Sequence, residues 1–167
     1  MPDVVRHVFA IAVLPATVTI AVPIWIARRF AVPVAFPDAF FESLALALGL
    51  ACLGLGVTLF VLCLRRFAGE GEGTLAPWDP PRALVVRGPY RYVRNPMITG
   101  VIAVLLGEAL CLRSLPHFAW ALVFTGLNLV YIPLVEEPGL ERRFGEAYKR
   151  YCENVPRIVP RATPWQG

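Results

Sequence analysis

The stretch FESLALALGLACLGLGVTLFVLCL, residues 41–64, contains one charged side chain, that of Glu42. A helix needs about 20 apolar residues to cross the bilayer core, which is about 30 Å thick. Three further apolar runs, two of them short, occupy residues 8–27, 97–112 and 117–135. The sequence therefore predicts an all-α integral membrane protein, a single membrane domain over residues 1–167 with about four transmembrane helices.

The composition agrees with this prediction. Hydrophobic residues make up 57% of the chain, charged residues 17%, and the mean hydropathy is +0.60. Soluble domains carry about 25% charged residues. These values exclude a disordered chain, a collagen and a disulfide scaffold, and they argue strongly against a soluble globular domain. The net charge of +4 comes without a basic block or a nucleic-acid motif, so we expect the lipid bilayer, and no nucleic acid, as a partner.

The distribution of basic residues predicts the orientation. With four spans, the N-terminus, the loop at 65–96 and the tail at 136–167 share one side, which holds 13 of the 16 Arg and Lys residues. Cytoplasmic loops are enriched in Arg and Lys, so we expect both termini in the cytoplasm. The compact, Arg-rich chain suggests a bacterial inner membrane. The loop and the tail are then expected to form a cytosolic site together.

Small residues recur at helical spacing in two of the spans: Ala45, Gly49, Cys52 and Gly56 in the second, and Gly100, Ala103 and Gly107 in the third. Such residues let helices approach closely in lipid. Three interpretations stay open at this point. They are helix packing within the chain, a homo-oligomer formed through the second span, and space for a cofactor beside the third.

The polar segments contain residues that are typical of turns and of helix boundaries. Gly88 followed by proline predicts a turn. Asn95 and Pro96 suit the N-cap and first position of a helix. Pro138 and Gly139 are expected to interrupt the fourth helix, so that the tail begins a new amphipathic helix over residues 137–153. Its apolar face is formed by Leu140, Phe144, Tyr148, Tyr151 and Val155.

Three polar groups are expected to meet at the cytosolic membrane surface. They are residues 87–95, the pair Glu136 and Glu137, and the tail with Tyr148, Tyr151 and Arg157. Carboxylates suit ribose hydroxyls or an ammonium group, Tyr rings stack on a base, and Arg91, Arg94 or Arg157 suits a carboxylate or phosphate. This chemistry fits a nucleotide-like cofactor, although interface charges without any ligand are an open alternative. No metal is expected, since the two histidines lie far apart and no CxxC pair occurs.

Two motifs carry a resemblance to a known family. The stretches RGPYRYVRNPMITG (87–100) and EEPGLERRFGEAYKRYCENVPRIVPR (136–161) flank an apolar span pair. This arrangement resembles the isoprenylcysteine carboxyl methyltransferase and phospholipid methyltransferase superfamily, in a bacterial-type member. The resemblance implies an integral membrane methyltransferase that uses S-adenosylmethionine, releases S-adenosylhomocysteine, and modifies a lipophilic small-molecule or lipid acceptor. It implies a cofactor site formed by Gly88, Tyr90, Arg94, Asn95, Pro96, Gly100, Glu136, Glu137, Tyr148 and Tyr151, with Arg94, Asn95 and Glu137 as catalytic residues.

Two positions depart from the family pattern. Asn95 stands where the motif has His, and Ile98 stands where it has Tyr. Asn still donates and accepts hydrogen bonds but does not titrate near neutral pH, so we favour a holding role for it. The resemblance implies in-line transfer of the methyl group to the acceptor, whether this is a carboxylate, an amine or a thiol. The alternatives are an NADPH-dependent membrane lipid or sterol-type reductase and a non-catalytic membrane scaffold.

Overall fold

The computed structural model describes residues 15–34, 36–70 and 83–167. Over this part of the chain the regular elements are all helical and no strand occurs, which confirms the all-α prediction. The elements are, in order, η1 (Thr17–Ala21), α2 (Val22–Arg29), α3 (Phe40–Glu70), η2 (Gly88–Arg91), α4 (Pro96–Cys111), α5 (Leu115–Tyr131), η3 (Ile132–Glu136), α6 (Glu137–Phe144) and α7 (Glu146–Asn154).

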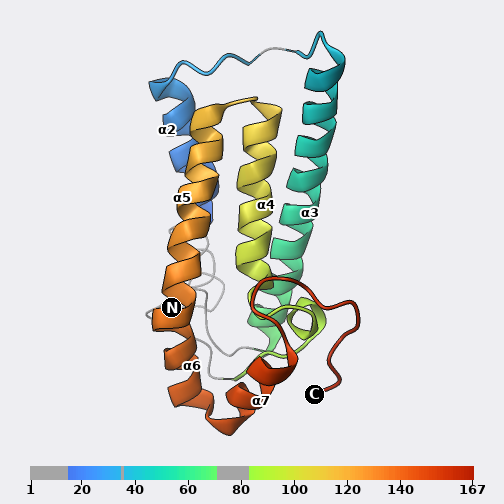
Figure 1. Cartoon of the computed structure of the whole chain (residues 1–167), viewed down its shortest axis with the longest axis vertical. Coiled ribbons are helices and arrows are strands. Elements are labelled where there is room, and N and C mark those ends of the chain that lie inside the picture. The colour runs from blue at the N-terminus through green and yellow to red at the C-terminus, as the bar shows by residue number, and fades with distance from the viewer. Residues whose placement is uncertain (1–14, 35, 71–82) are drawn as a thin grey trace.

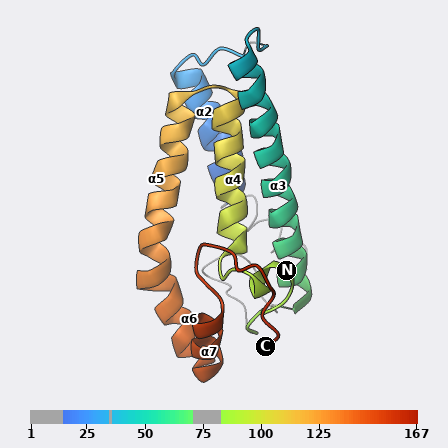
Figure 2. The same ribbon diagram turned by 45° about the vertical axis from the view of Figure 1, so that its right-hand side comes forward.

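The long helices form an upright bundle. Helices α2, α3, α4 and α5 run roughly along the long axis of the molecule (Figure 1). The second view shows α4 between α3 and α5 (Figure 2). The short elements η2, α6 and α7 gather with the C-terminal residues at one end of the bundle (Figures 1 and 2). The polar segments are therefore concentrated at that end.

Among the described residues, two helical stretches are long and apolar enough to cross a membrane, Phe40–Arg66 and Leu115–Phe144. Most of their apolar side chains are not covered by the protein; the exposed ones include Leu50, Leu55, Val57, Leu62, Leu122, Val123, Leu127 and Val130. Exposed apolar surface of this extent marks a site of interaction with a membrane or with another protein. The length and composition of these helices favour a membrane protein, and the predicted spans at 41–64 and 117–135 are helices of sufficient length.

The other two predicted spans are less complete. Helix α4 has 16 residues, which at 1.5 Å per residue give about 24 Å, less than the thickness of the bilayer core. Residues 8–14 of the first predicted span lie outside the described residues, and the helical turns of η1 and α2 follow them. Four membrane crossings therefore stay a prediction.

Glycines bring α3 and α4 into close contact. A Cβ atom on Gly56 would lie 2.6 Å from the carbonyl oxygen of Gly100, and one on Gly107 would lie 2.8 Å from that of Gly49. Both distances are too short for a side chain. The small residues of the second and third spans therefore serve packing within the chain, and the surface considered for a homo-oligomer is used by α4.

Element η1 and helix α2 are attached to α5 by hydrogen bonds to their backbone. The indole Nε1 of Trp120 donates to the carbonyl oxygen of Val18 (3.1 Å), and His117 Nε2 donates to that of Pro23 (3.1 Å). In a π-helical turn the carbonyl of Val18 would bond to the amide five residues on. That residue is Pro23, which has no N–H, so Trp120 supplies the missing donor.

The prediction that Pro138 and Gly139 interrupt the fourth helix is wrong. The chain stays helical from α5 through η3 into α6. The wider π-helical turn at Ile132–Glu136 takes up the local distortion that prolines impose. The break falls instead at Gly145, whose φ of +55° separates α6 from α7. The single amphipathic helix expected over 137–153 is therefore two helices.

Candidate active site at the polar end of the bundle

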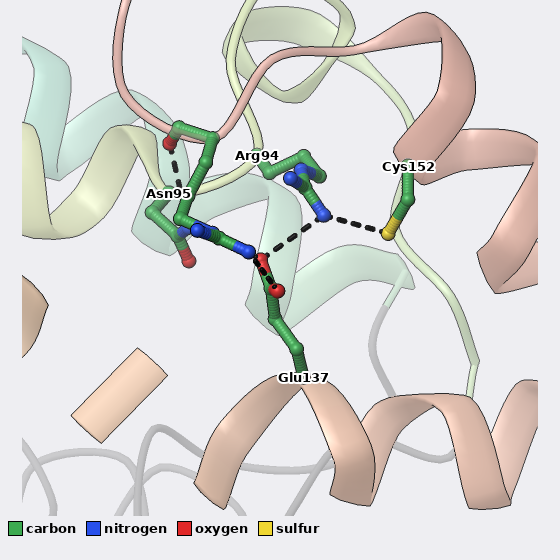
Figure 3. Close-up of polar contacts among 5 residues, drawn as sticks. Arg94, Asn95, Glu137 and Cys152 are labelled. Atoms are coloured by element: carbon green, nitrogen blue, oxygen red, sulfur yellow. Dashed lines mark hydrogen bonds and ion pairs between the residues drawn. The ribbon is translucent and has the colours of Figure 1, made fainter. Parts of the chain in front are cut away.

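Three segments that are distant in sequence meet around the carboxylate of Glu137. Arg94 Nη1 lies 3.0 Å from Glu137 Oε1. Arg157 binds the same carboxylate in a bidentate manner, with Nε donating to Oε1 (2.8 Å) and Nη2 to Oε2 (2.5 Å). Figure 3 shows Arg94 and Glu137 facing each other across the cluster. The predicted meeting of the three polar groups is thus seen in the structure, and we call Arg94, Glu137 and Arg157 the ion-pair cluster.

The members of the ion-pair cluster differ in exposure. The side chains of Arg94 and Glu137 are 12% and 14% exposed, and that of Arg157 is 37% exposed. Arg94 Nη1 also donates to Cys152 Sγ on α7 (2.7 Å; Figure 3). Its Nε atom is buried and has no hydrogen-bond partner in the part of the chain described. Ion pairs shielded in this way are screened less by solvent than surface pairs.

Asn95 occupies the N-cap position of α4, as predicted, and Pro96 is the first residue of the helix. The side chain of Asn95 does not cap the helix, however. The amide Nδ2 instead donates to the backbone carbonyl of Arg157 at 3.5 Å (Figure 3). The backbone N–H of Arg94 next to it donates to the carbonyl of Pro156 (2.9 Å). Asn95 and its neighbour thereby attach the start of α4 to the tail.

The tyrosines predicted to bind the cofactor form part of a packed core. Tyr148 and Tyr151 are buried together with Val155. The Tyr151 hydroxyl donates to the backbone carbonyl of Tyr90 (2.7 Å), whose own ring is buried. Burial raises the pKa of both Tyr148 and Tyr151, so their phenols stay protonated at neutral pH. These rings pack with Cys152, whose Sγ accepts a hydrogen bond from Arg94.

The remaining predicted site residues, Gly88, Pro96 and Gly100, have no polar side chain. Gly88 has a φ of +57° at the start of η2, and a Cβ there would lie 3.2 Å from Arg66 Nε. Pro96 is fully buried. Gly100 lies in the α3–α4 contact and not among the charged side chains. The structure therefore brings Arg94, Asn95 and Glu137 together and places Gly100 apart from them.

Glu136 is half-buried beside the ion-pair cluster. It forms no hydrogen bond or ion pair within the described ranges of the chain. Burial raises the pKa of Tyr90 well above its ordinary value, with smaller contributions from Cys63, Tyr151 and Glu136.

Sequence reasoning missed the part played by the last residues of the chain. Arg91, considered as a ligand for an anion, instead donates through Nη2 to Gln166 Oε1 (2.7 Å) and through Nε to the carbonyl of Trp165. The backbone N–H of Arg161 donates to the carbonyl of Tyr92 (3.0 Å). Trp165 is the one tryptophan of the tail, and it was the signal available in the sequence. Cys152, which accepts a hydrogen bond from Arg94, was also missed.

An open groove of about 400 Å³ lies between α6 and α7, lined by Pro138, Glu141, Arg142, Gly145 and Lys149. None of the residues of the ion-pair cluster lines it. The groove is therefore a separate surface feature, and the candidate site is defined by the side-chain contacts described above.

The fold and the site together define a helical membrane protein with a charged site at one end of its apolar helices. Comparison with protein-family models identifies its family: the chain belongs to the phospholipid methyltransferase family, whose model matches residues 44–147. It is therefore a membrane methyltransferase. The match includes Arg94, Asn95 and Glu137 and ends before Tyr148 and Arg157. No curated protein and no solved structure matches the chain.

Proposed function

We propose that this protein is an S-adenosylmethionine-dependent methyltransferase that acts on a lipophilic or membrane-embedded acceptor. The observation that carries the proposal is the ion-pair cluster, in which Arg94 and Arg157 share Glu137 at one end of apolar helices. Charged side chains there suit a soluble, charged cofactor. The adjoining apolar helices suit an acceptor that arrives from the bilayer.

The residues at the site fit the amino-acid end of this cofactor, which carries a carboxylate and an ammonium group, and its ribose. When bound, S-adenosylmethionine supplies a methyl group that a sulfonium centre already activates. The task of the protein is therefore positioning. Arg94 or Arg157 suits the carboxylate of the cofactor, and Glu136 or Glu137 suits its amino group or ribose hydroxyls. Glu136, which has no ion pair or hydrogen bond among the described residues, in particular fits a ligand that carries a positive charge.

The contacts and chemistry of Asn95 support a role in holding the site together, and not a role in proton transfer. Its side chain is bonded to the tail through the carbonyl of Arg157, and an amide does not take up a proton near neutral pH. A carboxylate acceptor needs no base, whereas an amine or thiol must first lose its proton. A carboxylate is therefore the acceptor that these residues fit best, with an amine or thiol as alternatives.

The proposed topology has four membrane crossings with both termini in the cytoplasm of a bacterial cell. The excess of Arg and Lys in the loop at 65–96 and in the tail supports this orientation. The ion-pair cluster would then lie at the cytosolic face, where the cofactor is dissolved.

Calorimetry on the detergent-purified protein tests the proposal, with S-adenosylhomocysteine and NADPH titrated in parallel. We expect saturable one-site binding of S-adenosylhomocysteine and no binding of NADPH. Binding of NADPH alone would instead support a reductase. Binding of neither ligand to folded protein would support a non-catalytic role. Transfer of a labelled methyl group from S-adenosylmethionine into a lipid extract then identifies the acceptor class.

A further inference from the structure

The tail of the chain turns back toward the apolar helices after α7. Both views show the C-terminal segment returning from α7 to the level at which α4 begins (Figures 1 and 2). The contacts agree with the views: the carbonyl of Pro156 accepts from the backbone N–H of Arg94 (2.9 Å), and that of Arg157 accepts from the Asn95 side chain. The residues that follow, 158–161, therefore lie near the end of α4 at which its apolar run starts.

Two apolar side chains of this returning stretch are exposed. Ile158 is 51% exposed and Val159 is 73% exposed. Tyr92, whose carbonyl accepts a hydrogen bond from the backbone N–H of Arg161 (3.0 Å), is also exposed. We call Tyr92, Ile158 and Val159 the exposed trio. Apolar side chains that gather on adjoining segments in this way mark a surface for a partner.

The stretch that carries Ile158 and Val159 is fixed at both ends. Before it, Arg157 forms two hydrogen bonds to the carboxylate of Glu137. After it, Arg161 donates through Nη1 to the carbonyl of Asn154 (2.6 Å). The two apolar side chains are thus presented by an ordered segment, and a partner that covers them does not have to order it first.

Position and charge favour lipid as this partner. The apolar run of α3 ends at Leu64, and the exposed Arg65 and Arg66 follow it. Arg66 lies against η2, since a Cβ on Gly88 would be 3.2 Å from its Nε, and η2 leads directly to Tyr92. Arginines at the end of an apolar helix extend into the headgroup region and attract anionic lipids. Apolar and aromatic side chains beside them fit the boundary between hydrocarbon and water.

We propose that the exposed trio binds the surface of a bilayer that contains anionic lipid, with Ile158 and Val159 inserted at headgroup depth. This contact is additional to the apolar helices and belongs to the polar tail. It holds Arg157, the residue directly before Ile158, in place on Glu137, so that the bilayer itself supports the ion-pair cluster. The inference does not depend on the identity of the cofactor or of the acceptor.

Tryptophans placed at exposed positions test this contact. Val159→Trp puts an indole in the exposed trio. Glu146→Trp is the matched control, because this side chain is 86% exposed at the start of α7, at the end of the molecule away from the apolar helices (Figure 1). The proteins are placed in nanodiscs of phosphatidylcholine and phosphatidylglycerol, with or without bromine on the acyl chains near the headgroups. The emission of the wild type is subtracted.

Bromine quenches indoles only at short range, so the two variants should differ. We expect the emission added by Val159→Trp to be blue-shifted and largely lost in the brominated nanodiscs. The emission added by Glu146→Trp should stay at the wavelength of an indole in water and lose little. Both positions are exposed, so the unfolding temperatures should match that of the wild type. Ile158→Trp repeats the test at the neighbouring position if Val159→Trp does not fold.

Trypsin provides a second measurement that needs no added tryptophan. In the same nanodiscs, the double variant Ile158→Ser with Val159→Ser should be cut after Arg161 faster than the wild type, because its tail no longer inserts. Cleavage after Arg150 on α7 is the internal control and should keep its rate.

Three results would overturn the inference. The first is that bromine quenches Val159→Trp no more than Glu146→Trp. The second is that the emission of Val159→Trp is blue-shifted but not quenched, which would show that protein, such as a second copy of the chain, covers the exposed trio. The third is that the double variant and the wild type are cut after Arg161 at the same rate.

Discussion

Arg91 and Trp165, which are 74 residues apart, hydrogen-bond to each other in both directions. The backbone N–H of Trp165 donates to the carbonyl of Arg91 (3.0 Å), and Arg91 Nε donates to the carbonyl of Trp165. The ring of Trp165 also lies 5.8 Å from that of Tyr151, measured between centroids. The C-terminal segment, which lies outside the family match at 44–147, therefore fixes the chain that leads into Arg94.

Trp165→Ala should weaken both the fold and the site. The side chain is half-buried in the Tyr148–Tyr151 core, so we expect a loss of about 1–3 kcal/mol in unfolding free energy, below the value for a fully buried Trp. Binding of S-adenosylhomocysteine should weaken in parallel. Trp165→Phe keeps a ring and should lose less of both. Thermal unfolding and calorimetry provide the measurements, and wild-type behaviour of Trp165→Ala would contradict this view of the tail.

Gly56→Ala should separate α3 from α4. The new methyl group would lie 2.6 Å from the carbonyl oxygen of Gly100, so the helices must shift, at a cost of about 1–3 kcal/mol. Gly54→Ala is the matched control, since a Cβ there meets nothing within 4 Å. Thermal unfolding in detergent should show a lower midpoint for Gly56→Ala only. Equal midpoints for the two variants would show that this helix contact is not tight in solution.

Two substitutions of Asn95 distinguish a role in holding the site together from a role in proton transfer. Asn95→Ala removes the bond to the carbonyl of Arg157 and should weaken S-adenosylhomocysteine binding several-fold, by about 0.5–1.5 kcal/mol. Asn95→His retains an N–H donor and should keep much of that affinity. The dependence of the methyl-transfer rate on pH should be the same in Asn95→His and the wild type. A faster histidine variant with a new titration near pH 6.5 would assign proton transfer to this position.

Tyr151→Phe removes the hydrogen bond to the buried carbonyl of Tyr90 and should cost about 1–3 kcal/mol in unfolding free energy. The pH dependence has a definite sign. Because burial raises the pKa of Tyr151 in the folded state, the unfolded state loses this proton first. Stability should therefore be constant near neutrality and fall above about pH 10, the ordinary pKa of tyrosine. Chemical unfolding between pH 7 and 11 should show a smaller fall in Tyr151→Phe.

The sequence predicted the helices, because apolar runs of sufficient length can be recognised locally. It also predicted the meeting of the polar segments, because the order of the apolar runs sets the end of the bundle at which each connecting loop lies. It did not predict which charges pair. The pairing of Arg157 with Glu137 depends on the path of the chain after Val155, which the buried Tyr148–Tyr151 core sets. The sequence analysis also predicted a helix break at Pro138 and Gly139, whereas the break between α6 and α7 falls at Gly145. A proline inside a helix is accommodated by neighbouring turns, and single-residue preferences do not reveal this.

The sequence by itself determined that this is an all-helical membrane chain with its charged segments outside the apolar runs. Burial of uncharged helices in lipid is favourable wherever such runs occur. Only the tertiary structure decided that Arg94, Glu137 and Arg157 form one cluster, that Glu136 has no partner within the described residues, and that Trp165 fixes the approach to the site. These contacts join residues far apart in the chain, and side-chain distances follow from how the helices pack and not from their order.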